Sequence, residues 1–179
     1  MQNALQTIIP RACAVSVAAI AALIDHRTGK IPNLLTLPIL IVGPAYWGLV
    51  HGVLGFAESL AGILVCGIPA LVAYRAAGMP GGDLKLFAAV GGLLGPTLGL
   101  EVEFFALVAA SFFGVFVLAR KGRLRATLVD TLYFPINRFL PEKKRRVPEA
   151  RPTEQIRLGP FVLFGTLVAI ARHSRQWMQ

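Results

Sequence analysis

The chain has 179 residues, of which 55% are apolar and only 15% are charged, whereas about 25% of the residues in a soluble domain are charged. So few solubilising side chains exclude a disordered or ordinary water-soluble protein and indicate a membrane protein. The net charge of +9 could suggest nucleic-acid binding, but most basic residues lie between apolar stretches, so we expect no nucleic-acid partner.

Six apolar segments are candidates for membrane helices, since a bilayer core of about 30 Å requires about 20 residues per helix. In chain order they run from Thr7 to Ile24, Leu34 to Val50, Phe56 to Ala76, Leu84 to Leu100, Phe104 to Ala119, and Leu158 to Ala171. We therefore predict an all-α integral membrane protein with about six transmembrane helices in one domain, residues 1–179. The sixth segment is short, and its alternative placement is on the membrane surface.

The basic residues predict the orientation of this bundle. Connections at residues 25–33, 75–85 and 120–157 hold 15 of the 18 Lys and Arg residues, and the connections near His51 and around Glu101 hold none. Because basic loops stay in the cytoplasm, the amino terminus is predicted to lie outside. We expect the loop at 120–157 to set the topology and to adhere to anionic lipid, with binding of a protein partner as the alternative.

Two acidic residues lie at the predicted cytoplasmic ends of apolar segments. Asp25 ends the first segment, and Asp83 precedes the fourth. A charge held near a bilayer is costly, so each is a candidate functional group; the structural alternatives are a helix end at Asp25 and an N-cap at Asp83. Each acid is accompanied by residues that bend the chain and by a basic residue. The residues concerned are Arg27, Ile31, Pro32, Asn33 and Thr36 after Asp25, and Gly81, Gly82 and Lys85 around Asp83.

These two motifs and the order of the apolar segments resemble the type IV prepilin peptidases, membrane aspartyl proteases of the GxGD type, above all the short form of Flp (tight-adherence) pilus systems. The late Leu158-Gly159-Pro160-Phe161 is similar to a Gly-Pro-Phe sequence of that family. The resemblance implies that Asp25 and Asp83 are the catalytic pair, in the positions of D-x-[KR]-x-x-x-I-P-N and G-x-G-D-x-K. One departure is Pro80, which replaces the first Gly of the second motif and fixes φ before the turn at Asp83.

The resemblance also implies the substrate and the location. The substrate would be a prepilin or pseudopilin with a short leader and an apolar helix, cut after a Gly of the leader. The enzyme would cross the bacterial inner membrane several times and act near its cytoplasmic face.

Two carboxylates suit peptide hydrolysis by an activated water molecule. One takes a proton from water, and the other, as a carboxylic acid, polarises the scissile carbonyl. Such a pair shares one proton, and Lys85 together with the helix start favours Asp83 as its ionised member. The serines lack a nucleophile motif, so we do not expect nucleophilic catalysis. We expect no cofactor, and no metal, because a metal site needs more ligands than two carboxylates and an isolated His.

Two other functions are compatible with these residues. A small transporter would bind protons or cations at Asp25 and Asp83, and ion flux into liposomes that depends on Asp83 would identify it. A non-catalytic pilus assembly factor would have lost activity through Pro80, and restoring Gly at position 80 would then create cleavage. The oligomeric state is left open by the sequence.

Overall fold

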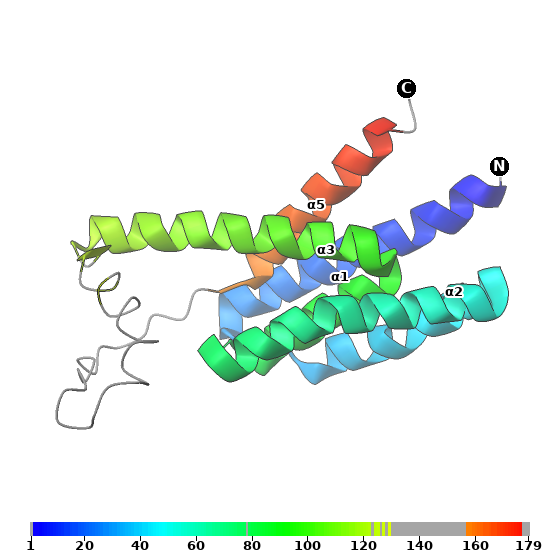
Figure 1. The fold of residues 1–179 in the computed structure, drawn as a ribbon, viewed down its shortest axis with the longest axis horizontal. Coiled ribbons are helices and arrows are strands. Elements are labelled where there is room, and N and C mark those ends of the chain that lie inside the picture. The colour runs from blue at the N-terminus through cyan, green and yellow to red at the C-terminus, as the bar shows by residue number, and fades with distance from the viewer. Residues whose placement is uncertain are drawn as a thin grey trace. The chain divides into compact units, whose positions relative to one another are not determined.

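A computed structural model describes residues 2–77, 79–122, 124, 125, 127, 129 and 157–176. These residues form the helices α1 (Gln2–Thr28), α2 (Asn33–Ala77), α3 (Gly81–Arg120) and α5 (Gly159–Gln176) (Figure 1). No strand occurs within this part of the chain, so the prediction of an all-α protein is confirmed there. Most of the predicted basic loop, including Glu142–Arg146, lies outside the described residues.

The chain divides into two compact units, residues 1–109 with 157–179 and residues 110–156. The first unit contains α1, α2, the first part of α3 and α5, and it holds both acidic motifs. The described part of the second unit includes the end of α3, which exposes apolar side chains such as Phe112 and Phe116. Both candidate functional residues, Asp25 and Asp83, therefore belong to the first unit.

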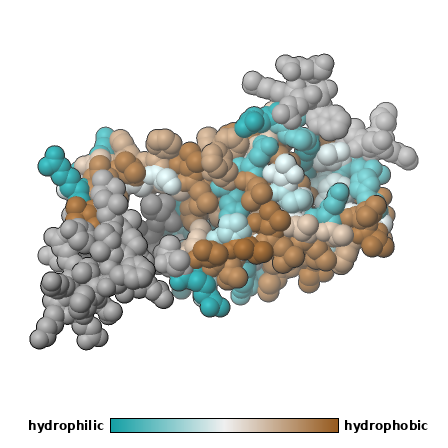
Figure 2. All heavy atoms as spheres, viewed as in Figure 1, coloured by the Kyte–Doolittle hydropathy of each residue, from teal (hydrophilic) through white to brown (hydrophobic). Residues whose placement is uncertain are grey.

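Three helical stretches are long and apolar enough to cross a membrane. They are Gln6–Thr28, Asn33–Arg75 and Gly81–Arg120. Figure 2 shows apolar residues over much of the visible face, and α2 exposes large apolar side chains such as Ile41, Leu49 and Val53. An apolar outer surface of this extent is typical of a protein whose solvent is lipid.

Helices α2 and α3 each turn back on themselves at a glycine with positive φ. The helical segments meet at Gly52 (φ 65°, ψ −150°) in α2 and at Gly95 (φ 79°, ψ 174°) in α3, a backbone region that glycine adopts without a steric penalty. A Cβ atom on Gly48 would lie 3.5 Å from the Cβ of Phe56, although a continuous helix separates residues eight apart by about 12 Å. Each helix is therefore a hairpin, as Figure 1 shows for α2.

The reversal at Gly52 falls in the predicted connection near His51, but the second reversal comes earlier than the sequence indicated. We expected it around Glu101 and Glu103, and it occurs at Gly95, directly before Pro96. Proline suits the first turn of a new helix because it needs no N–H partner there. The apolar pattern continues through this turn, so hydropathy gave no sign of it. Glu103 consequently lies inside the helix and is only 4% exposed.

The reversal in α3 leaves backbone carbonyls at the end of its first helical segment, and α2 supplies hydrogen-bond donors to two of them. Ser59 Oγ donates to the carbonyl of Gly92 at 2.6 Å, and Trp47 Nε1 donates to the carbonyl of Leu93 at 2.9 Å. Trp47 also stacks on His51, with ring centroids 5.4 Å apart. Unpaired carbonyl groups cost free energy away from water. These hydrogen bonds therefore stabilise the contact between the α2 and α3 hairpins.

Both acidic residues belong to buried helix faces. On α1, Ala14, Ala18, Ala21 and Asp25 are buried at spacings of three and four residues, which places them on one side of the helix. The buried face of α3 begins at Asp83 and continues through Leu86, Phe87 and Val90. The core of the first unit thus extends to both carboxyl groups.

We predict that Gly62→Ala destabilises the fold. The added Cβ would meet the Gly91 carbonyl oxygen and lie 2.8 Å from the Gly91 carbonyl carbon, which is backbone and cannot move aside. The expected loss is about 1–3 kcal/mol, measured as thermal unfolding in detergent. The matched control is Gly67→Ala, whose Cβ would make an ordinary 3.6 Å contact with Ala88; an equal loss in both variants would contradict this account.

Candidate active site

Asp25 lies at the carboxyl-terminal end of α1 and is 5% exposed. Gly29, with φ of 67°, ends the helix and donates its N–H to the Asp25 carbonyl at 2.8 Å, a common way for a helix to terminate. The Asp25 side chain points instead toward α5, where its Oδ2 atom accepts the N–H of Gly159 at 2.9 Å. Figure 1 shows the start of α5 beside the end of α1.

Asp83 lies in the first turn of α3 and is 3% exposed. The carbonyl of Pro80 accepts the Asp83 N–H at 3.1 Å, so the turn before the helix forms with proline in place of the motif glycine. At Gly82 an added Cβ would lie 3.0 Å from the Cβ of Ile31. The absence of a side chain at Gly82 therefore lets the α1–α2 connection pack directly against the start of α3.

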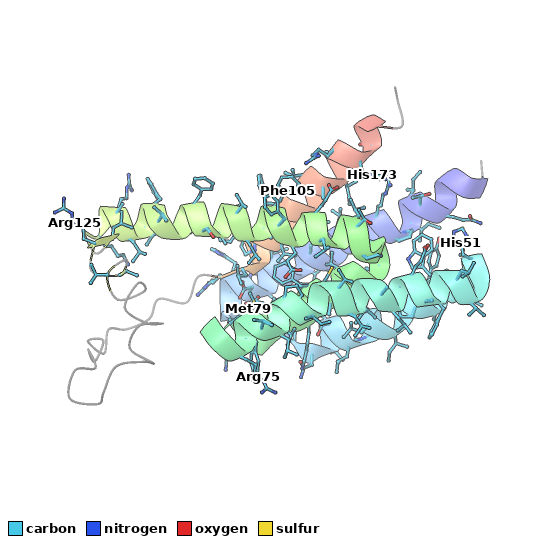
Figure 3. All side chains as sticks on the ribbon, viewed as in Figure 1. His51, Arg75, Met79, Phe105, Arg125 and His173 are labelled. Carbon is cyan, nitrogen blue, oxygen red and sulfur yellow. The ribbon has the colours of Figure 1, made fainter. Side chains whose placement is uncertain are left out.

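The same connection brings the two acidic motifs together. Lys85 Nζ donates to Asn33 Oδ1 at 2.8 Å, which links the starts of α2 and α3. The Asp25 carboxylate is close enough that its charge acts on Asp83. Two buried carboxyl groups from helices far apart in the sequence therefore interact electrostatically. Figure 3 labels Met79, just before α3, and His51, next to the reversal of α2. The two residues lie toward opposite ends of the first unit.

The other predicted site residues occupy different surroundings. Arg27 is exposed on the last turn of α1, and Gly81 has room for a Cβ 3.6 Å from Tyr74. The carbonyl of Pro32 accepts the N–H of Leu35 at 3.1 Å at the start of α2. Thr36 is 1% exposed, and within the described part of the chain its Oγ1 atom has no hydrogen-bond partner.

Sequence reasoning assigned no contact with Asp25 to α5. Besides the Gly159 amide, the Arg157 guanidinium donates to the carbonyl of His26. The only signal for this arrangement was the Gly-Pro pair at 159–160, because a backbone donor leaves no side-chain pattern. Sequence reasoning likewise did not predict burial of Glu103, whose Oε2 atom has no partner among the described residues.

The arrangement brings two carboxyl groups into one buried region of the first unit. Among the described residues, no group of three or more His, Cys, Asp or Glu side chains is placed to hold a metal ion. Two buried carboxyl groups within electrostatic reach can accept and donate protons in one reaction.

Comparison with known proteins assigns the chain to a family. No curated protein and no solved structure matches the chain. A family model, described as the type IV leader peptidase family, matches residues 12–119, which make up more than half of the chain and include Asp25 and Asp83. The chain therefore belongs to the type IV leader peptidase family.

Proposed function

We propose that the protein is an aspartic endopeptidase that removes the leader peptide of Flp-type prepilins at the cytoplasmic face of the bacterial inner membrane. Membership of the leader peptidase family supports a peptidase that acts on prepilins. The observation that carries the aspartic mechanism is the burial of Asp25 and Asp83 within reach of each other's charge. No other pair of acidic residues in the described part of the chain is buried in this way at helix ends.

The proposed membrane arrangement has six crossings with the amino terminus outside. The crossings would be α1, the segments of α2 on either side of Gly52, the segments of α3 on either side of Gly95, and α5. Helix α5 has 18 residues and would span about 27 Å. The connections next to Asp25 and Asp83 carry basic residues, and this charge supports their placement in the cytoplasm.

The proposed reaction uses one carboxylate and one carboxylic acid. The carboxylate takes a proton from water as the water oxygen bonds to the scissile carbonyl carbon, and the carboxylic acid gives its proton to the carbonyl oxygen. In the second step the first Asp returns its proton to the amide nitrogen, the C–N bond breaks, and one hydroxyl of the diol returns a proton to the second Asp. The pair regains its starting state, and the products are a carboxylic acid and an amine.

The location of the pair also bears on the substrate. Prepilins of the family carry a leader followed by an apolar helix, and cleavage after a Gly is what the resemblance implies. An intact helix hides its carbonyl groups in internal hydrogen bonds. A glycine at the cut weakens the helix there, so the backbone can extend at the point where the substrate leaves the membrane.

We predict that Asp25→Asn and Asp83→Asn each reduce cleavage of a pilin precursor by about 1,000-fold or more, because neither amide can exchange the required proton. Leader release by the purified protein is measured by mass spectrometry, without nucleotide and in the presence of a metal chelator. The matched control is Glu101→Gln, an acidic residue near the reversal of α3. Full cleavage by either Asp variant would remove that residue from the mechanism.

We predict that Pro80→Gly changes the cleavage rate by less than about threefold, because proline already permits the Asp83 N–H bond that starts α3. The rate is measured with the same precursor at several substrate concentrations. Activity in the glycine variant together with an inactive parent would instead favour the non-catalytic assembly factor.

We predict that alkaline phosphatase fused after His51 is active and that the same enzyme fused after Lys30 is inactive. The reversal at Gly52 would face the outside, where this reporter folds, and the α1–α2 connection would face the cytoplasm. Fusions to a fluorescent protein that matures only in the cytoplasm provide the reciprocal control. The opposite pattern would invert the proposed orientation and place the acidic pair on the outer side.

A further inference from the structure

The partner of Asp25 comes from the far end of the chain. Gly159 lies 134 positions later, and its backbone N–H donates to Asp25 Oδ2 in a buried hydrogen bond of 2.9 Å. Hydrogen bonds to an ionised carboxylate are shorter and stronger than those between neutral groups. The bond therefore holds Asp25 Oδ2 in place and leaves Oδ1 to exchange protons.

The amide of Gly159 is available because it stands at the first position of α5. The first internal bonds of this helix run from the N–H groups of Phe161 and Val162 to the carbonyl of Leu158, each at 2.9 Å. The N–H groups at the start of a helix have no partner within that helix. In α5 this unused donor meets the carboxyl group, and the helix dipole also favours negative charge at this end.

Close packing requires glycine at this position. A Cβ on residue 159 would lie 2.9 Å from the Asp25 Cβ, 3.0 Å from Asp25 Oδ2 and 3.0 Å from the Ala22 Cα. The contact atoms include backbone, so a side chain could not be accommodated by a rotamer change. Gly159 belongs to the buried face of α5 together with Val162, Thr166 and Ala169, and α5 packs against α1.

A second bond holds the same segment to α1. The Arg157 guanidinium donates to the carbonyl of His26, one of the carbonyls at the end of α1 that lack a partner within a regular helix. Residues 157–159 thus bind the end of α1 through an exposed hydrogen bond from Arg157 and a buried one from Gly159. The buried bond is the one that restricts rotation of the Asp25 side chain.

Asp83 is held differently. In the described part of the chain its carboxyl oxygens accept no hydrogen bond, and Lys85, two residues further on, donates to Asn33. Among the described residues, Asp25 receives a hydrogen-bond donor that favours its ionised form and Asp83 receives none. This asymmetry suits Asp25 to take the proton from water and Asp83 to donate its proton to the carbonyl oxygen, which reverses the expectation from Lys85 and the start of α3 that Asp83 is the ionised member.

We propose that Gly159 is a positioning residue for the proposed peptidase, whose backbone amide orients Asp25 as the general base. This inference rests on the proposed function. It adds a residue of α5 to a proposed catalytic site that is otherwise formed by the two acidic motifs. Gly159 itself touches neither water nor substrate in this scheme.

The decisive experiment replaces one amide by an ester in the full-length protein. Glycolic acid at position 159 removes the N–H without adding an atom. The matched control is α-hydroxyisovaleric acid at position 162, which removes the Val162 N–H bond to Leu158 in the same helical turn but no bond to Asp25. Both proteins are assembled by semisynthesis, and kcat, KM and the pH profile of kcat are measured with a purified pilin precursor.

The ester at 159 should lower kcat by roughly 10- to 100-fold, the range expected for a lost hydrogen bond to a charged group. KM should stay within about twofold, and the pH profile should shift, because the lost bond acts on Asp25 rather than on substrate binding. The ester at 162 should leave all three close to those of the parent. Equal kcat values and pH profiles in the two esters would overturn the inference, because both would then report only a weakened helix.

A side-chain variant gives a second measurement. Gly159→Ala should lower kcat at least as much as the ester at 159, since its Cβ displaces the Asp25 side chain, whereas Gly67→Ala should be active. Full activity of Gly159→Ala would overturn the inference. If the parent itself releases no leader, the proposed function fails and the inference with it; if the parent cleaves and position 159 is indifferent, only the inference fails.

Discussion

The burial of two carboxyl groups at the edge of an apolar helical bundle is the constraint on which the rest of the structure depends. Asp25 and Asp83 are each at most 5% exposed, and ionised groups are costly in such surroundings unless they are hydrogen-bonded or share a proton. Hydrogen bonds at this end of the bundle offset part of this cost. The Gly159 amide reaches Asp25, and the Lys85–Asn33 bond joins the helices next to Asp83.

Glycine residues allow the close approach of the backbone that these contacts require. Gly82 admits Ile31, Gly159 admits Asp25, and Gly62 lies against Gly91. Without a strong hydrophobic drive between helices in lipid, close backbone approach and buried hydrogen bonds supply much of the association energy. The same close packing limits movement of the two acids, and the proposed reaction requires this because both must act on one water molecule and one carbonyl group.

Much of this architecture was readable from the sequence. Hydropathy located the apolar helices, and positive-φ glycine at residue 52 lies where the change in pattern near His51 indicated a connection. The turn at Gly95 was misplaced by about two helical turns, because its neighbours Leu94 and Leu98 are apolar and a turn whose carbonyls are capped by Trp47 and Ser59 needs no polar residue of its own.

The acidic pair was recognisable from local motifs, although its catalytic role stays a prediction. The contact between Asp25 and Gly159 was not predictable, because it joins residues 134 positions apart through a backbone donor. Lys85 was expected to act on Asp83 because of its proximity in sequence, but its ammonium group bonds to Asn33. Spacing within a motif identifies candidate residues, and only the packing of the helices decides which atoms meet.

The caps on the α3 reversal bear on how the protein is assembled during synthesis. The Gly92 and Leu93 carbonyls receive their donors from α2, one from each arm of that hairpin. Without α2 these carbonyls would lack their donors, which costs free energy wherever water does not reach them. The hairpin that is synthesised first therefore supplies the hydrogen-bond donors that the later hairpin needs.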